Sequence, residues 1–267
     1  MSLDARRTRL WNRLGLGPVW AVRGTQGASF AEEARSSFAE ASASFAEASE
    51  AGSAFAEAAA SAKADPNAAV ARMHWDELER AVAACTACGL CKTRTNTVFG
   101  VGSHASEWMV IGEAPGAEED LRGEPFVGQA GRLLDSILAA AGLGRSGSGP
   151  SGVYIANVVK CRPPANRNPE PDEAARCEPF LRRQIELLAP RVILVMGRVA
   201  AQAVLGSDAS IAALRGRAHR MDVAGRAVPV IVTYHPAYLL RNLADKAKVW
   251  ADLCLAREVH QRASGPR

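Results

Sequence analysis

The sequence lacks any run of about 18 consecutive apolar residues, the length that a helix needs to cross a membrane. Its first residues contain no long apolar stretch before a small-residue cleavage site, so we expect no secretory signal peptide. A strong charge of one sign is also absent, because the net charge of the 267 residues is only +4. These absences predict a protein that stays inside the cell without membrane contact. The mildly basic charge permits nucleic-acid binding but does not require it.

Structural disulfides are rare inside cells, so the six cysteines need another explanation. They are Cys85, Cys88, Cys91, Cys161, Cys177 and Cys254. The first three stand in the stretch CTACGLC, where the Cys-x-x-Cys spacing lets two thiolates reach one metal from a tight turn. Cys161 and Cys177 can complete a set of four, although Cys91 also continues the pattern. Four thiolates suit zinc and an iron–sulfur cluster alike. Cys254 is alone in an apolar helix and is predicted to be a core residue.

The N-terminal part of the chain differs in composition from the rest. Residues 28–63 repeat the unit SFAEA with slight variation, which predicts a solvated linker with partial helicity over residues 28–74. Residues 1–27 combine basic and apolar side chains, as a docking peptide for a replication or repair protein does. A short helix packed on the chain's own domain is an equally good interpretation. Residues 75–267 are predicted to form the globular domain.

Four short, apolar runs in this domain predict strands that are buried on both faces. They are WMVIGEA (108–114), VYIANVVK (153–160), RVILVMG (191–197) and VPVIVTYH (228–235). Helical segments separate them, which predicts an α/β fold of three layers, α/β/α, around a four-stranded parallel sheet. Three strands run directly into the polar segments GEAPG, NVVKCRPPANR and HPAYLLRN. Because ligands bind beyond the carboxyl ends of such strands, we expect the functional site there.

The chain resembles the family 4 uracil-DNA glycosylases, the iron–sulfur branch of their superfamily, over roughly two thirds of its length. The matching motifs run in order as CTACGLCKTRT, FGVGS, GEAPGAEEDLRGEPFVGQAGRLLD, VYIANVVKCRPPANRNPEPDE, MGRVAAQAVLG and HPAYLLRN. The resemblance implies the uracil-DNA glycosylase fold and leaves Cys91 as a spare thiol. It implies a [4Fe–4S] cluster on Cys85, Cys88, Cys161 and Cys177.

The resemblance also implies an activity. Such an enzyme flips uracil out of DNA and hydrolyses its N-glycosidic bond, and the abasic site it leaves starts base excision repair. Ala114 in GEAPG and the loop CRPPANRNP favour ordinary hydrolysis over the covalent attachment of a related branch. We expect a monomer that acts on uracil-containing DNA in the cytoplasm, associated with the nucleoid. The competing interpretation is a catalytically inactive iron–sulfur module that binds DNA in replication.

Four positions implied by the resemblance concern the uracil itself. His235 donates a hydrogen bond to uracil O2 as negative charge develops there, and Asn157 reads the O4 and N3–H edge. Phe126 stacks on the flipped base. Glu119 lies near uracil C5, where it excludes the methyl group of thymine, whereas Asp120 is expected to cap a loop.

Glu113 is the second catalytic residue expected, either as the group that orients water or as an electrostatic partner of the cationic sugar. A carboxylate that only binds loop amides is the alternative. Gly112 and Gly116 are expected to let the backbone approach DNA closely.

The remaining candidates are expected to contact DNA outside the base pocket. Leu239 and Leu240 predict a wedge that fills the gap left by the flipped base, although packing within the protein can explain either one. Arg241 suits a phosphate contact. Asn166 lies on the loop after the second predicted strand, where it can touch the DNA backbone together with Arg162 and Arg167.

Overall fold

The computed structural model describes residues 66–263. The predicted docking peptide and residues 28–65 of the predicted linker lie outside the described residues, and the boundary at residue 74 stays a prediction. Within that range the chain begins with helices α2 (Pro66–Val70) and α3 (Trp75–Ala83). Both helices contact α6 (Pro171–Leu188), and Arg183 of α6 donates a 2.8 Å hydrogen bond to the carbonyl of Met73 between them.

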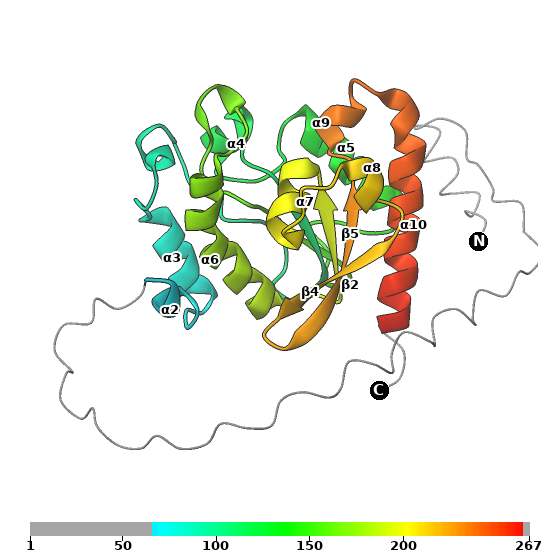
Figure 1. Cartoon of the computed structure of the whole chain (residues 1–267), viewed down its shortest axis with the longest axis horizontal. Helices are drawn as coiled ribbons and strands as arrows, with labels where there is room; N and C mark the ends of the chain where they lie inside the picture. Colours follow the sequence, from blue (N-terminus) through cyan, green and yellow to red (C-terminus); the bar gives the residue numbers. More distant parts are fainter. Residues whose placement is uncertain (1–65, 264–267) are drawn as a thin grey trace, which may run out of the picture.

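Five strands form one sheet in the order β2-β1-β3-β5-β4 (Figure 1). Four of them are parallel and correspond to the four predicted strands, which confirms the predicted fold class. The bounds are β1 Ser106–Gly112, β2 Gly149–Asn157, β3 Val192–Met196, β4 Ala218–Val223 and β5 Arg226–Thr233.

The fifth strand, β4, is the element that the sequence analysis missed. It pairs antiparallel with β5 through a two-residue turn in which Ala224 and Gly225 both have positive φ, as tight hairpins require. Its sequence AHRMDV contains no apolar run, and most of its side chains are at least partly exposed. β4 lies at the edge of the sheet, where its side chains are only partly covered by other elements. It therefore does not need the continuous apolar pattern of the central strands.

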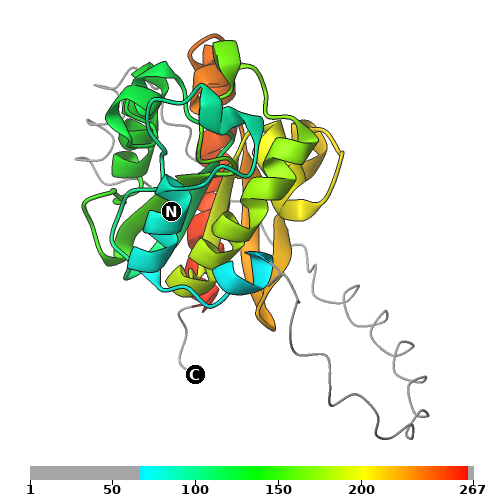
Figure 2. The ribbon, with the colours of Figure 1, turned by 90° about the vertical axis from the view of Figure 1, so that its left-hand side faces the viewer.

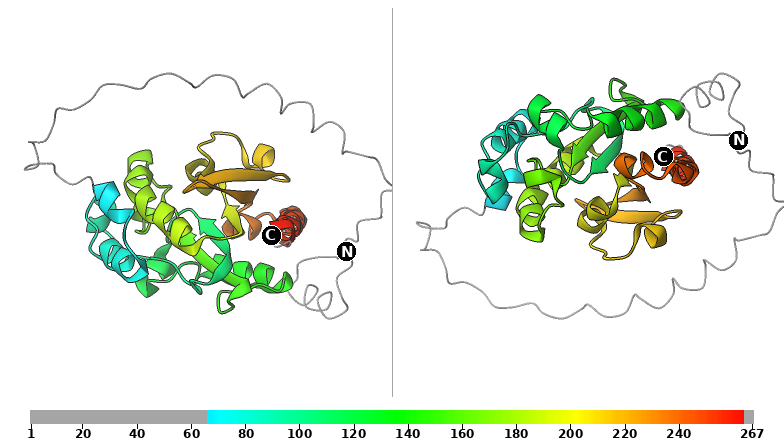
Figure 3. Two further views of the ribbon diagram at one scale, coloured as in Figure 1. Left: turned by 90° about the horizontal axis from the view of Figure 1, so that it is seen from below. Right: turned by 90° about the horizontal axis from the view of Figure 1, so that it is seen from above.

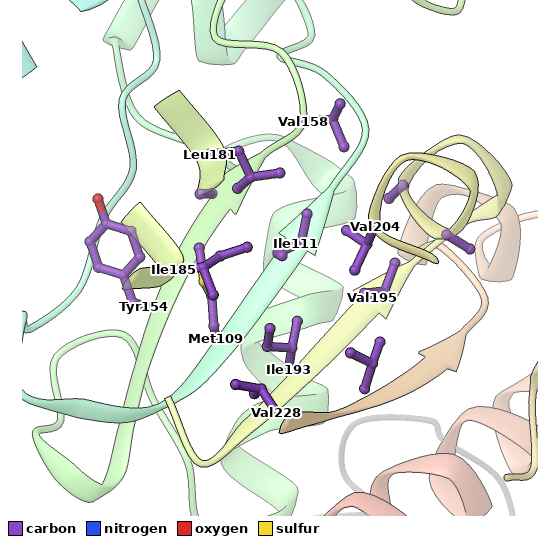
Figure 4. Close-up of a cluster of buried hydrophobic side chains, with 14 of the residues drawn as sticks. Met109, Ile111, Tyr154, Val158, Leu181, Ile185, Ile193, Val195, Val204 and Val228 are labelled. Atoms are coloured by element: carbon purple, nitrogen blue, oxygen red, sulfur yellow. The ribbon is translucent and has the colours of Figure 1, made fainter. Parts of the chain in front are cut away.

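Alternate residues of the central strands enter two separate cores, one on each face of the sheet. Met109, Ile111 and Ile193 share one core with side chains of α6 and α7 (Arg198–Leu205), which Figure 4 shows. Trp108 and Val110 share the other with α5 (Gln129–Ala140) and α10 (Lys246–Ala263). Figures 2 and 3 show the resulting three layers, with α6 and α10 on opposite sides of the sheet.

The remaining elements are short and mostly connect strands to helices. They are η1 (Gly89–Lys92), α4 (Ala117–Arg122), η2 (Pro164–Asn166), α8 (Ile211–Leu214), α9 (Pro236–Leu239) and η3 (Leu243–Asp245). All four parallel strands end at the same edge of the sheet, and Figure 1 shows α4 and α9 beyond their tips. This edge is where the polar segments after the strands meet. No helix in residues 66–263 is long and apolar enough to cross a membrane.

Candidate active site

A pocket opens at the carboxyl ends of the parallel strands, where the sequence analysis expected the site. Its walls come from the segments after β1, β2 and β5 and from the loop before α5. The predicted site residues that line it are Glu113, Gly116, Glu119, Phe126, Asn157, Asn166, His235 and Arg241. Residues about 120 positions apart in the chain therefore share one pocket.

Asn157 ends β2 and is only 2% exposed. Its side-chain oxygen Oδ1 has no hydrogen-bond partner among the described residues. A buried amide oxygen without a partner costs free energy, on the order of 1–3 kcal/mol, and is rare in folded proteins. Because Asn157 lines the pocket, that oxygen is placed to accept a hydrogen bond from a bound molecule.

Gly112 is paired with Asn157 across β1 and β2, and the structure gives a different reason for this glycine than the expected approach to DNA. A Cβ at Gly112 would lie 2.5 Å from Oδ1 of Asn157 and 2.6 Å from Cζ of Phe126. A side chain at position 112 would therefore displace both residues. The glycine makes room for the pocket's own side chains.

Phe126 is held in the pocket by an unusual backbone. Its φ is +54°, a conformation that side-chain-bearing residues rarely adopt, and its ring is largely buried. A Cβ at Gly131 of α5 would collide with the carbonyl oxygen of Phe126, so the helix approaches this turn only through a glycine. The ring of Phe126 is stacked on that of His235, with centroids 5.4 Å apart and planes 30° apart.

His235 is the N-cap residue of α9, and its geometry determines which ring nitrogen carries the proton. Nδ1 accepts a 3.2 Å hydrogen bond from the backbone N–H of Ala237, so in the neutral ring the hydrogen is on Nε2. Burial lowers the pKa of His235 to about 4, and Glu119 opposes that shift only partly. At neutral pH the imidazole is therefore uncharged and offers Nε2–H as a donor.

Glu113 follows β1 and lines the same pocket. Burial raises the pKa of its carboxyl group, and the positive charge of Arg198 at the start of α7 partly opposes this. Its own backbone carbonyl accepts a hydrogen bond from Val159 N–H at 3.2 Å, which fixes the main chain beside β2. The sequence analysis did not single out Arg198.

Glu119 accepts backbone hydrogen bonds from three residues of the two loops around it. Its Oε2 accepts from Gly116 N–H at 3.1 Å, and its Oε1 accepts from Val127 and Gly128 N–H at 3.1 and 3.2 Å. The carboxylate therefore ties the start of α4 to the turn that carries the aromatic ring of the pocket. The neighbouring Asp120 accepts from Thr95 and Asn96 N–H, which confirms its expected role as a loop cap.

The segment after His235 places its leucines differently from the expected wedge. Leu239 is fully buried in the core between α5 and α10, so packing explains it and the wedge interpretation is wrong for this residue. Leu240 is partly exposed and Arg241 is exposed. Leu243 of η3 has 63% of its surface exposed, and the sequence analysis missed it because an isolated leucine directly after the motif carries no pattern.

Two of the expected DNA contacts on the loop after β2 are engaged within the protein. Arg167 forms two hydrogen bonds of 2.8 and 2.7 Å with the carboxylate of Glu173. Arg162 donates to Oδ1 of Asn166 at 2.7 Å. Asn166 has φ of +55° and lines the pocket, so the loop presents it at the rim.

A second, smaller cavity lies between α3, η1 and α6, and five of the six cysteines line it. They are Cys85, Cys88, Cys91, Cys161 and Cys177. Cys254 is half-buried on α10 and does not line this cavity. The proposed ligand set of four therefore comes together from three segments of the chain, with Cys91 beside it.

The thiols of this cavity face hydrogen-bond donors and cations. Arg94 donates to Sγ of Cys161 at 3.1 Å, and the backbone N–H of Lys160 donates to Sγ of Cys177 at 3.3 Å. Burial raises the pKa of Cys161, and it raises the pKa of Cys177 to about 11. No group of three or more His, Cys, Asp or Glu residues within residues 66–263 is gathered tightly enough to hold a metal ion.

Comparison with known proteins agrees with the fold class. A family model described as "Uracil DNA glycosylase superfamily" matches residues 99–254. The type-4 uracil-DNA glycosylase of Archaeoglobus fulgidus is 45% identical over 62% of this chain and 82% of its own length. The type-4 enzymes of Thermotoga maritima and Pyrobaculum aerophilum are 46% and 40% identical, over 61% and 68% of this chain and 82% and 93% of their own lengths. The chain belongs to the uracil-DNA glycosylase superfamily and, within it, to the type-4 uracil-DNA glycosylases.

Proposed function

We propose that this protein is a monofunctional uracil-DNA glycosylase that flips uracil out of DNA, hydrolyses its N-glycosidic bond and leaves an abasic site for base excision repair. The observation that carries the proposal is the buried, unpartnered Oδ1 of Asn157 in a pocket that also contains Phe126 and a neutral His235. Membership of the type-4 family supports the same activity.

Asn157 selects uracil by its pattern of donors and acceptors. Its Oδ1 accepts from uracil N3–H, and its Nδ2 donates to uracil O4. Cytosine carries an acceptor at N3 and an amino donor at C4, so the same amide meets like groups at both positions. An amide that keeps this orientation therefore rejects cytosine.

His235 stabilises the leaving base. As the glycosidic bond breaks, negative charge develops on uracil, and Nε2–H of the neutral imidazole donates to O2. Since burial keeps the ring neutral, it can donate without a competing proton transfer at neutral pH. Phe126, whose ring lies beside that of His235, stacks on the flipped base in this proposal.

Glu113 acts on the sugar side of the bond. Its carboxylate either orients the attacking water or stabilises the cationic sugar, and the pocket accommodates both roles. Glu119 contributes indirectly, because it holds the turn that carries Phe126, and it stays a candidate for excluding the methyl group of thymine.

DNA outside the pocket is contacted by the rim. Arg241 and Asn166 line the opening, which supports phosphate contacts by these two side chains. Because Leu239 is buried, Leu240 and Leu243 are the candidates for the wedge that fills the gap in the DNA base stack. Leu243 has the larger exposed surface of the two.

Cys85, Cys88, Cys161 and Cys177 are proposed to hold a [4Fe–4S] cluster. In such a cluster each thiolate binds a different iron, so the sulfurs lie farther apart than the ligands of one zinc ion. Four cysteines around one cavity are consistent with that arrangement. When bound, the cluster supplies four iron–thiolate bonds that join the segment before β1, the loop after β2 and helix α6.

Three further expectations belong to this proposal. The protein acts as a monomer, it works on cellular DNA in the cytoplasm at the nucleoid, and residues 1–27 dock it to a replication or repair protein. Residues 66–75 pack on α6, so a truncation that tests docking should remove residues 1–65 only. That truncation should leave excision from naked DNA unchanged, and a loss of excision would place the segment in the catalytic fold.

The activity is tested with single- and double-stranded oligonucleotides that contain one uracil, followed by alkaline cleavage of abasic sites. Matched oligonucleotides with thymine or cytosine at the same position are the controls. Strand scission confined to the uracil substrates supports the proposal. An absence of scission at every salt concentration would refute it and leave the inactive DNA-binding module.

A further inference from the structure

The carbonyl group of Asn157 lies on the open edge of the sheet. β2 is an edge strand, with β1 on one side only. On its other side Ile155 exchanges two backbone hydrogen bonds with Val101, at 2.8 and 2.9 Å. Successive residues of a strand alternate in direction, so the backbone of Asn157 points the same way as that of Ile155. Within residues 66–263 no strand lies there to pair with it.

The side chain of Lys160 supplies the hydrogen-bond donor that a neighbouring strand would otherwise provide. Its Nζ donates to the backbone oxygen of Asn157 at 2.8 Å and to Oε1 of Gln184 at 2.6 Å. Gln184 donates in turn to the carbonyl of Phe99 and the hydroxyl of Tyr154. Lys160 is 1% exposed and Gln184 is fully buried, so this network is sealed from water. The ammonium therefore has a fixed position next to the proposed base-reading residue.

The same lysine is part of the cysteine cavity. Its backbone N–H donates to Sγ of Cys177, and the next residue is Cys161. Among the described residues no carboxylate forms an ion pair with Lys160, and the hydrogen bond to Cys177 and the adjacent Cys161 bring two sulfurs of the cavity close to it. A buried ammonium is unfavourable without a countercharge. Thiolates that bind a metal cluster supply that charge.

We propose that Lys160 is a positioning residue that couples the four-cysteine site to Asn157. Metal-bound thiolates stabilise the buried ammonium, and the ammonium fixes the backbone oxygen of Asn157 and with it the orientation of the amide in the pocket. The inference rests on the proposed glycosylase function. It makes the cysteine site a determinant of base selection as well as a structural link.

Coupling between two sites is reciprocal, so it can be measured from either side. In the purified iron-containing protein, saturating free uracil should slow the loss of iron to a chelator by roughly fivefold or more. The wild-type protein alone decides this point, because an unchanged rate of iron loss in the presence of uracil overturns the coupling.

The substitution Lys160→Met tests the residue itself. It should abolish the protection of iron by uracil and lower kcat/KM for uracil in single-stranded DNA by roughly 10- to 100-fold. It should also reduce the preference for uracil over cytosine, which a merely structural defect would leave unchanged. The matched control is Lys92→Met, the same change at an exposed lysine, which should behave as the wild type.

A second variant covers the case in which Lys160→Met does not fold. Gln184→Met keeps the ammonium but removes one of its two acceptors, so it should shift both readouts in the same direction by a smaller factor. If uracil still protects iron from the chelator in the folded variants, and their preference for uracil over cytosine is unchanged, the inference is overturned. Excision by the wild-type protein would still support the proposed function in that case. Wild-type protein that neither binds nor excises uracil would instead overturn the function.

Discussion

Replacing Gly112 with alanine should disable base recognition and leave the fold in place. The added Cβ would lie 2.5 Å from Oδ1 of Asn157 and 2.6 Å from Cζ of Phe126, whereas ordinary van der Waals contact begins at 3.4 Å. Each side chain must therefore shift by about 0.9 Å to relieve the contact. Both belong to the pocket, and neither can move into the sheet behind it.

The size of the effect follows from these distances. A misplacement of about 1 Å at a reacting site costs on the order of 100-fold in rate, so kcat/KM for uracil should fall by about that factor. Overpacking of a buried site costs about 1–3 kcal/mol of stability. For a domain of this size that corresponds to a fall in Tm of about 2–12 °C.

The assay is steady-state excision from a single-stranded uracil oligonucleotide, with Tm measured by circular dichroism on the same samples. Gly144→Ala is the matched control, because a Cβ at Gly144 meets no atom within 4 Å. It should retain wild-type kcat/KM. A Gly112→Ala protein that is folded and within threefold of wild-type activity would refute the assignment of Asn157 and Phe126 to the base pocket.

Three further predictions follow from individual side chains. Asn157→Asp loses the donor to uracil O4, so the rate of uracil excision should fall by roughly 10- to 100-fold and the preference for uracil over cytosine should decrease. An unchanged preference in competition assays would contradict the role of Asn157 in reading the base. Because the pKa of His235 is lowered to about 4 in the folded protein, the unfolded chain takes up that proton first, and the free energy of unfolding should decrease as pH falls from about 6.5 to 4. His235→Gln should flatten this part of the profile in urea titrations, and an unaltered slope argues against the buried neutral ring. Leu243→Ala should reduce excision from duplex DNA about tenfold more than excision from single-stranded DNA. The control is Leu121→Ala, which removes the other exposed leucine. Equal losses on the two substrates, or the same duplex-specific loss in Leu121→Ala, would exclude a wedge role for Leu243.

The fold and most of the pocket could be predicted because their signals are local in the chain. The continuous apolar runs of β1, β2, β3 and β5 identify buried parallel strands, and the polar segments after them had to meet at one edge. The strand β4 could not be found this way, because an edge strand with one exposed face has no continuous apolar run. Asn157 was noticeable as a polar residue within an apolar strand and His235 as a polar residue just past one, and the family resemblance supplied their roles.

Residue roles that depend on contacts between distant parts of the chain could not be predicted from the sequence. Leu239 and Leu240 are indistinguishable in sequence, and only their position relative to α5 and α10 decides that the first is core. The ion pair between Arg167 and Glu173 could not be predicted for the same reason, since Glu173 comes within reach only when the loop folds onto α6.

The sequence by itself determined the class of fold, the edge of the sheet that carries the site, and the residue types available for uracil recognition and for binding a metal. Periodicity and strand–helix alternation suffice for the fold class and the sheet edge, because they express hydrogen bonding and burial within short segments. The spacing of the cysteines indicated the metal site, and the resemblance to the family 4 enzymes supplied the residues for uracil recognition. Only the tertiary structure decided that Gly112 yields space to Asn157, that His235 presents Nε2–H, and that Lys160 connects the pocket with the cysteine cavity. These facts depend on contacts between segments far apart in the chain, and packing alone brings them within hydrogen-bond distance.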